Sequence, residues 1–425
     1  MSEQLTHAPT AVRRRSRLAR RYRNDVVLRG LGLSAILVAM LLLAILFASL
    51  IGTGWQAFLQ THVEVEVFVD PDRVDAENPQ DANYKAILDD AFLAYFPDVT
   101  GRRERRDVTA ILSPGARYIL RDTIVGDPQL IGQTIAVKLP ASDPVDQLAK
   151  GTISRDVPEQ QRRVSDRQIA WFDRLQERDL ISRPFNWQLF LSADSRHPEI
   201  AGLAGAIAGS FYALLVCFVL SFPLGIAAAI WLEEFAPRNR WTNLVEVNIN
   251  NLAAVPSIVF GLLGLAVLLN FLGMPRSAPL VGGMVLALMT MPTIIIATRA
   301  ALTAVSPSVR EAAYGVGASK HQVILHHVLP LAMPGILTGT IIGLAQALGE
   351  TAPLLLIGMN AFITSAPEGI LQPSTALPTQ IFIWADSPER GFVAKTSAAI
   401  LVLLGFLVLM NGAAVYLRRR FERKW

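Results

Sequence analysis

Charged residues are scarce in this 425-residue sequence. Asp, Glu, Lys and Arg make up 17% of it, against about 25% in a typical soluble chain, while hydrophobic residues reach 52%. Cysteine occurs once, at Cys217, so no disulfide can form within the chain. This composition excludes a purely soluble enzyme and a disordered chain, and it favours a membrane protein.

Motifs for metal and nucleotide chemistry are also missing. Residues 53–200 contain two isolated histidines, His62 and His197, and no nucleophile–base or metal-ligand grouping. The glycines before Lys320 lack the Gly-x4-Gly-Lys-Ser/Thr spacing of a phosphate loop. We therefore expect no metal, no cofactor, no catalytic residue and no ATP hydrolysis by this chain. The net charge of +4 comes from the ends and indicates topology rather than nucleic-acid binding.

Six apolar stretches are long enough to cross a bilayer, which requires about 20 helical residues. They are Leu31–Ile51, Ile207–Leu232, Ile249–Leu272, Pro279–Val305, Leu331–Met359 and Ala398–Leu417. Pro292 and Pro353 interrupt the fourth and fifth, which is tolerated where neighbouring helices or a cavity satisfy the freed backbone groups. The first stretch is longer than a signal peptide's apolar region and has no clear cleavage site, so we expect it to be retained.

The distribution of Lys and Arg predicts the orientation of these spans. If the chain starts inside, the short inner segments carry 17 of these residues and the short outer loops carry 3, namely Arg276, Arg390 and Lys395. We therefore expect a multi-pass protein of the cell inner (cytoplasmic) membrane with both termini in the cytoplasm. Residues 53–200 then lie outside.

Five regions follow from this map. They are a basic N-terminus at 1–30, a first helix at 31–52, an extracytoplasmic α+β domain at 53–200, a five-helix core at 201–417 with a polar loop at 308–330, and a basic tail at 418–425. The outer domain holds 24 of the 35 acidic residues. Alternation over His62–Val69 predicts a strand, and helical spacing over Ser165–Leu180 predicts a helix.

A basic run in the outer domain has two readings. As a solvated turn it has no partner, and as a functional surface it would meet an anionic substrate or a partner protein. Its members are Arg102, Arg103, Arg105 and Arg106.

The polar loop at 308–330 predicts two short amphipathic helices around Gly315 and Gly317. In the second helix an apolar stripe should face the protein, and Pro330 should end that helix and start the next span. The stripe comprises Val323, Ile324 and Val328, while Lys320, His321 and Gln322 are expected to face water or a partner.

The spacing of this loop resembles the EAA loop of ABC-transporter permeases. The matching residues are Glu311, Ala312, Ala313, Gly317, Leu329 and Pro330, with His327 where the family pattern has Ile. Two further stretches, Leu252–Gly261 and Gly349–Leu355, are similar to the phosphate-importer permeases, and residues 201–425 are most similar to the A subunit.

This resemblance implies an all-α polytopic core in the type I ABC importer permease arrangement. The implied function is that of a permease subunit of an ATP-driven inorganic phosphate importer, embedded in membrane lipid. The implied partners are a second permease, an ATP-binding subunit dimer that docks on the EAA loop and hydrolyses ATP, and an extracytoplasmic phosphate-binding protein. Another oxyanion, such as sulfate or molybdate, is the alternative cargo, and a membrane receptor with an outer sensing domain is a remote alternative.

Two ionisable residues stand out inside the expected spans, Arg299 and Glu350. Their places in the fourth and fifth spans put them at opposite depths, too far apart to pair. Arg299 then either snorkels to the cytoplasmic surface or contacts the leaving anion. Glu350, beside Thr351, either holds a cation or backbone donor of a partner, helps to close a gate, or satisfies donors exposed near Pro353.

Other residues of the fifth span complete the expected substrate path and packing surface. Gln346 lies one turn before Glu350, at a place where related phosphate permeases often carry an Arg that contacts phosphate. The neutral Gln346 implies that the partner permease supplies the cationic contact. Small residues recur every four positions and predict a close helix–helix seam, with the second permease as one candidate partner. They are Gly335, Gly339, Gly343 and Ala347.

Overall fold

The computed structural model describes residues 8–421 and divides into two compact units, one ending at Thr53 and the other beginning at Gly54. The first unit is the helix α1, Ala8–Gly54, of 47 residues. It contains the expected span Leu31–Ile51 and most of the preceding basic segment in one continuous helix. The first seven residues and the last four of the expected basic tail lie outside the described range.

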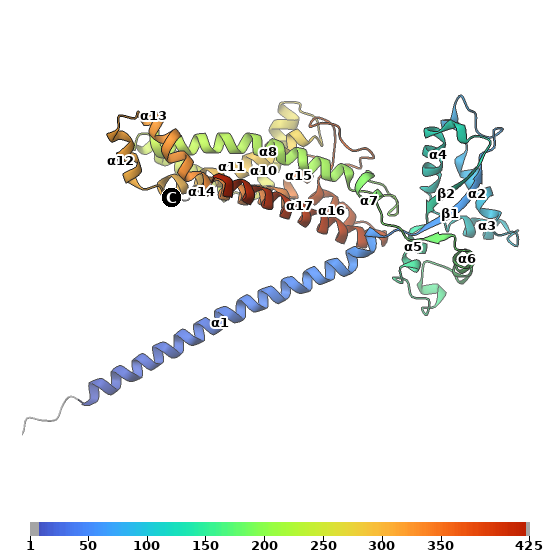
Figure 1. Ribbon diagram of the computed structural model, residues 1–425, viewed down its shortest axis with the longest axis horizontal. Helices are drawn as coiled ribbons and strands as arrows, with labels where there is room; N and C mark the ends of the chain where they lie inside the picture. Colours follow the sequence, from blue (N-terminus) through green and yellow to red (C-terminus); the bar gives the residue numbers. More distant parts are fainter. Residues whose placement is uncertain (1–7, 422–425) are drawn as a thin grey trace, which may run out of the picture. The chain divides into compact units, whose positions relative to one another are not determined.

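A small antiparallel sheet forms the centre of the domain that follows (Figure 1). Its strand order is β2-β1-β3, with β1 at His62–Phe68, β2 at Thr134–Pro140 and β3 at Ile181–Ser182. The predicted strand is therefore present as β1. Its alternate side chains fill the core because successive residues of a strand point to opposite faces. These buried residues are Val63, Val65, Val67 and Val69.

Helices pack around this sheet and complete an α+β domain. They are α2 (Tyr84–Leu93), α3 (Arg102–Thr109), α4 (Ala116–Gly126), α5 (Asp143–Ala149) and α6 (Asp166–Glu177), while the short helix α7 (Gln188–Leu191) packs against α8. The predicted helix is α6, which Ser165 starts through a capping box with Gln168. The basic run lies in α3 rather than in the expected turn, because Arg is a good helix former and the extended Gly101 precedes the run.

Long apolar helices make up the rest of the chain. They are α8 (Ala204–Ile230), α11 (Pro279–Thr303), α14 (Leu329–Gly349) and α17 (Gly391–Phe421), joined by α9 (Arg240–Ala253), α10 (Ser257–Leu263), α12 (Pro307–Gly315), α13 (Lys320–Gln322), α15 (Ala352–Leu356) and α16 (Leu377–Ala385). Pro292 lies inside α11, which stays continuous through it. The loop helices α12 and α13 lie at one end of this helical core, and α15 and α16 lie towards the other (Figure 1).

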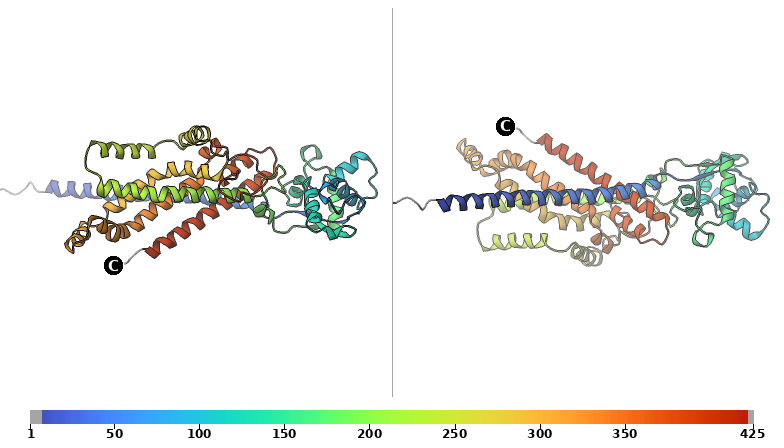
Figure 2. Two further views of the ribbon diagram at one scale, coloured as in Figure 1. Left: turned by 90° about the horizontal axis from the view of Figure 1, so that it is seen from above. Right: turned by 90° about the horizontal axis from the view of Figure 1, so that it is seen from below.

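The expected third and fifth spans are broken. Between α9 and α10 the chain bends by 103° at Pro256, because a proline disfavours helical geometry in the residue before it (Figure 2). The fifth span stops at Gly349, where Glu350 is extended, and α15 follows. The described residues thus contain five helices able to cross a membrane, or six if the bent pair counts as one span.

Buried polar contacts join the segment before α8 to α16 and to the start of α17. Trp384 Nε1 donates to Asp194 Oδ1 at 3.0 Å, and Lys395 Nζ donates to the carbonyl oxygen of Ala201. Burial raises the pKa of the Glu199 carboxyl at the same junction. Lys395, expected in an exposed outer loop, is therefore a buried residue of a helix.

Candidate functional site

The polar loop folds as a helix, a turn and a second helix. Helix α12 ends at Gly315, and Gly317 turns the chain with a φ of +84°, a left-handed conformation that favours glycine. Ser319 then starts α13 through a capping box with Gln322. The expected break at Pro330 is wrong, because the helix runs unbroken over Lys320–Gly349. The π-helical segment η7, Val323–Val328, shifts the hydrogen-bond pattern just before Pro330 and accommodates it.

This loop has a buried apolar side and an exposed side. Val323 and Val328 are at most 1% exposed and pack with α12 and the end of α11, and Ile324 is buried as well. Ala313 joins them, whereas Glu311, Ala312 and Gly317 are exposed. Leu329 and Pro330 are half-buried. His327 does not belong to the buried stripe, since it lines a cavity of about 780 Å³ between α11, α12 and α14.

Two apolar side chains on the exposed side were missed by the sequence analysis. Val316 is 85% exposed and Tyr314 is 47% exposed, one on each side of the end of α12. The residues around them in the loop are small or polar, so the presence of two larger apolar side chains was the signal in the sequence that could have identified them. An exposed apolar pair on a short helix is typical of a surface that a partner covers.

Arg299, near the C-terminal end of α11, forms ion pairs with two carboxylates. Its Nε donates to Glu233 Oε2 at 3.2 Å, and its Nη2 donates to Glu246 Oε1 at 3.0 Å. Thr303 Oγ1 donates to the other oxygen of Glu233 at 3.2 Å. The guanidinium is thus ion-paired, whereas the sequence analysis offered snorkelling or a free anion contact. Its partners were missed because they lie just outside the expected span limits, at Leu232 and Ile249.

A second ion pair ties α12 to the same region. Arg310 Nη2 donates to Glu234 Oε1 at 2.9 Å and to the carbonyl oxygen of Leu302 at 2.9 Å, while its Nη1 donates to that of Val305 at 2.7 Å. Glu233 and Glu234 are consecutive in the π-helical segment η5, Trp231–Phe235, that ends α8. One acidic pair therefore contacts α11, α9 and α12 through two arginines.

The two helix breaks pack against each other. A Cβ at Gly261 in α10 would lie 2.6 Å from the Cα of Pro353 in α15, so only glycine allows this approach. The structure thereby brings together Leu252–Gly261 and Gly349–Leu355, the two stretches that the sequence analysis singled out separately. Nothing in the local patterns indicated that they touch.

The expected path residues lie beside this contact. Glu350 and Thr351 are half-buried and Gln346 is exposed. Within residues 8–421 no side-chain hydrogen bond is made by Glu350 or Gln346, so both polar groups remain open to a partner or a ligand. The ion pairs of Arg299 include Glu233 and Glu246 and leave Glu350 out.

The glycine seam faces α11 of the same chain. A Cβ at Gly339 would lie 2.1 Å from that of Ala297, and one at Gly335 would lie 2.7 Å from that of Ala301. A Cβ at Gly343 would meet nothing closer than 3.8 Å, and Ala347 is buried. The candidate partner of this seam is therefore α11, and the second permease is not needed to cover it.

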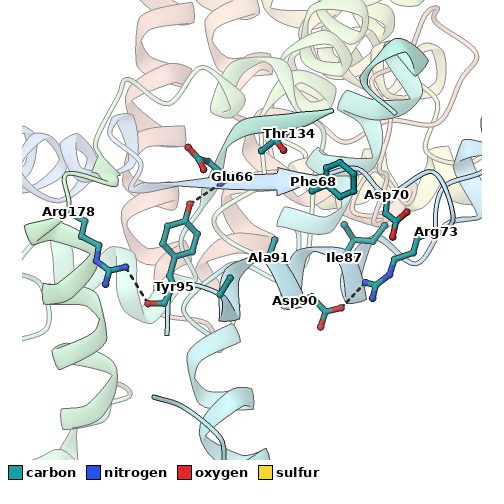
Figure 3. A pocket seen from close by; sticks show the side chains of 11 residues that line it. Glu66, Phe68, Asp70, Arg73, Ile87, Asp90, Ala91, Tyr95, Thr134 and Arg178 are labelled. Carbon is teal, nitrogen blue, oxygen red and sulfur yellow. Dashed lines mark hydrogen bonds and ion pairs between the residues drawn. The ribbon is translucent and has the colours of Figure 1, made fainter. Parts of the chain in front are cut away.

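A separate cavity of about 490 Å³ lies in the sheet-containing domain, between β1 and α2 (Figure 3). Its cationic groups are already engaged: Arg73 Nη1 donates to Asp90 Oδ2 at 2.7 Å, and Arg178 Nη1 donates to the carbonyl oxygen of Tyr95 at 3.3 Å. The described part of the chain has no group of three His, Cys, Asp or Glu side chains placed to hold a metal. This cavity adds no catalytic or anion-binding grouping.

Comparison with known proteins gives separate matches for the two halves of the chain. Residues 221–423 match the family model described as binding-protein-dependent transport system inner membrane component, and residues 15–159 match a domain of unknown function, DUF3333. A chain from a solved structure titled "Inward facing conformations of the MetNI methionine ABC transporter" is 17% identical, with a TM-score of 0.41, and the match covers 52% of this chain and 98% of that one.

Curated relatives share the second half of the chain. The phosphate transport system permease protein PstA of Yersinia pestis is 36% identical over 211 residues, 49% of this chain and 70% of that protein. The probable ABC transporter permease protein YqgI of Bacillus subtilis is 27% identical over 56% of this chain and 85% of its own length. The chain therefore belongs to the binding-protein-dependent transport system inner membrane components, as a multi-pass permease subunit of an ABC importer, in which a separate subunit hydrolyses ATP.

Proposed function

We propose that this permease imports inorganic phosphate. The PstA relative at 36% identity and the Gly349–Leu355 stretch support this cargo. In the proposed assembly a PstC-like second permease completes the path, a PstB-like ATPase dimer binds the loop at 308–330, and a PstS-like binding protein delivers phosphate outside. Both termini are then cytoplasmic.

The observation that carries the docking proposal is the two-sided loop around α12. Its buried side fixes it to α11 and α14, and its other side exposes Glu311, Tyr314 and Val316. Exposed aromatic and aliphatic anchors beside small residues suit insertion into a groove of a partner. We expect the ATPase groove to receive them.

Co-purification tests this docking surface. Val316→Glu or Glu311→Arg should release the ATPase while the permease still folds, since neither side chain is buried. Phe68→Glu is the matched control, because Phe68 is also exposed, at 54%, but lies on β1. Full ATPase recovery with both loop variants would refute the assignment.

Orientation and cargo need their own measurements. A cysteine placed at the exposed Ser319 should react with a membrane-impermeant maleimide only when the reagent has access to the cytoplasmic side of the membrane. Labelling of this cysteine from outside would overturn the topology.

Sulfate or molybdate remains the second candidate cargo, because the neutral Gln346 stands where a cation is common in phosphate permeases. Competition among the three anions in an uptake assay separates these cargoes.

A further inference from the structure

The acidic pair Glu233–Glu234 lies where four elements meet. Glu233 reaches Arg299 of α11, which also holds Glu246 of α9, and Glu234 reaches Arg310 of α12. Consecutive side chains on a helix point about 100° apart, so one short segment can hold two partners on different elements. We propose that this pair is the link that positions α9 relative to α12, so that movement of the loop helix reaches the helix breaks.

Arg310 fixes α12 in a way that its apolar contacts cannot. Two of its three hydrogen bonds go to the carbonyl oxygens of Leu302 and Val305, at and just beyond the end of α11. Its third goes to Glu234. Apolar surfaces can slide over each other, whereas hydrogen bonds to a guanidinium hold one geometry. Helix α12 therefore cannot shift without carrying the end of α11 and η5 with it.

The other arm of the link ends on α9. Beyond the ion pair of Glu246, this helix packs on α11 through Ile249, which lies beside Ile295 and Met291. It leads directly to the bend at Pro256 and so to the contact of Gly261 with Pro353. A displacement of α9 thus acts on the place where the two breaks pack.

The burial of these ion pairs suits a link that keeps its geometry. Their side chains are between 13% and 31% exposed, so they are neither free in water nor sealed in the core. Charge-assisted hydrogen bonds that are partly shielded from water hold a defined arrangement of the two groups. The π-helical conformation of η5 agrees with this, since such segments occur often at functional sites.

The test measures uptake per ATP hydrolysed in the assembled transporter, and it rests on the proposed function. Arg299→Met and Glu246→Met, both outside the docking loop, should leave ATPase binding and hydrolysis in place and lower phosphate uptake per ATP about tenfold. Arg174→Met is the matched control, because Arg174 also pairs with a carboxylate, Asp98, at 2.9 Å but lies in the sheet-containing domain. Wild-type coupling in both link variants would overturn the proposal.

A conservative variant covers the case in which these variants do not accumulate. Arg299→Lys keeps a cation between Glu233 and Glu246, so it should retain more uptake per ATP than Arg299→Met. An Arg299→Lys variant that binds and drives the ATPase but transports no better than Arg299→Met refutes the link. If the unaltered chain binds no ATPase, or carries another anion, the proposed function fails instead, and the two failures are distinguishable.

Discussion

The contact between α11 and α14 allows a graded test of close packing. Ordinary van der Waals contact begins at 3.4 Å, and a Cβ at Gly339 would lie only 2.1 Å from that of Ala297. The two helices would have to separate by about 1.3 Å, because a Cβ is fixed to its backbone and cannot rotate away. For Gly335 the same difference is about 0.7 Å, from 2.7 Å, and for Gly343 no movement is needed.

These distances predict an order of stability. Overpacking a core costs about 1–3 kcal/mol, while replacing Gly by Ala within a helix gains up to about 1 kcal/mol. Gly339→Ala should therefore lower the free energy of unfolding by about 2 kcal/mol, Gly335→Ala should change it little, and Gly343→Ala should raise it slightly. Adding Ala297→Gly to Gly339→Ala should recover most of the loss, since it removes the methyl group that is met.

Denaturant unfolding of the purified permease in mixed micelles measures this series, with helicity followed by circular dichroism. Equal stability of the three single variants would refute the claim that this seam is set by contact within the chain. So would a Gly339→Ala variant that Ala297→Gly does not rescue.

Three further outcomes are expected. Burial raises the pKa of the Glu199 carboxyl above its ordinary value of 4.5. The contribution of this group to stability is therefore full below pH 4.5 and is lost as the pH rises through the raised pKa. Glu199→Gln should flatten that part of a plot of melting temperature against pH. Glu350→Ala should lower uptake about tenfold, as for an open intramembrane carboxylate, and Gln346→Ala only modestly; unchanged uptake for Glu350→Ala would favour a structural role. Gly317→Ala should cost about 1 kcal/mol in thermal unfolding because of its positive φ, whereas Gly315→Ala, with equally open surroundings, should not.

Local patterns predicted the elements that depend on local physics. Alternation found β1, spacing and a cap found α6, and apolar length found α8, α11 and α17 to within several residues. Proline was read less well. Pro292 leaves α11 continuous and Pro330 leaves its helix unbroken, whereas Pro256 lies at the 103° bend that was not expected. A proline's effect depends on what packs against the freed backbone groups, which sequence spacing does not contain.

Contacts between distant segments were the other gap. Arg299 and Glu350 were the ionisable groups expected within the spans, but Arg299 pairs with Glu233 and Glu246, 66 and 53 residues away. Those carboxylates lay just beyond the assumed span ends, so an allowance of one more helical turn would have included them. The approach of Gly261 to Pro353 has no such signal, because it arises from two separate bends.

The unbroken helix over Lys320–Gly349 has a mechanical consequence. Thirty residues of helix form a rod of about 45 Å, whose lower end is the exposed loop and whose upper end is Glu350. Since it has no hinge at Pro330, a tilt imposed near Ser319 swings the opposite tip in the reverse direction about the tight crossing at Gly339. The contact at Gly339 would then act as the pivot of this helix, and its tightness would determine how much of a displacement near Ser319 reaches Glu350.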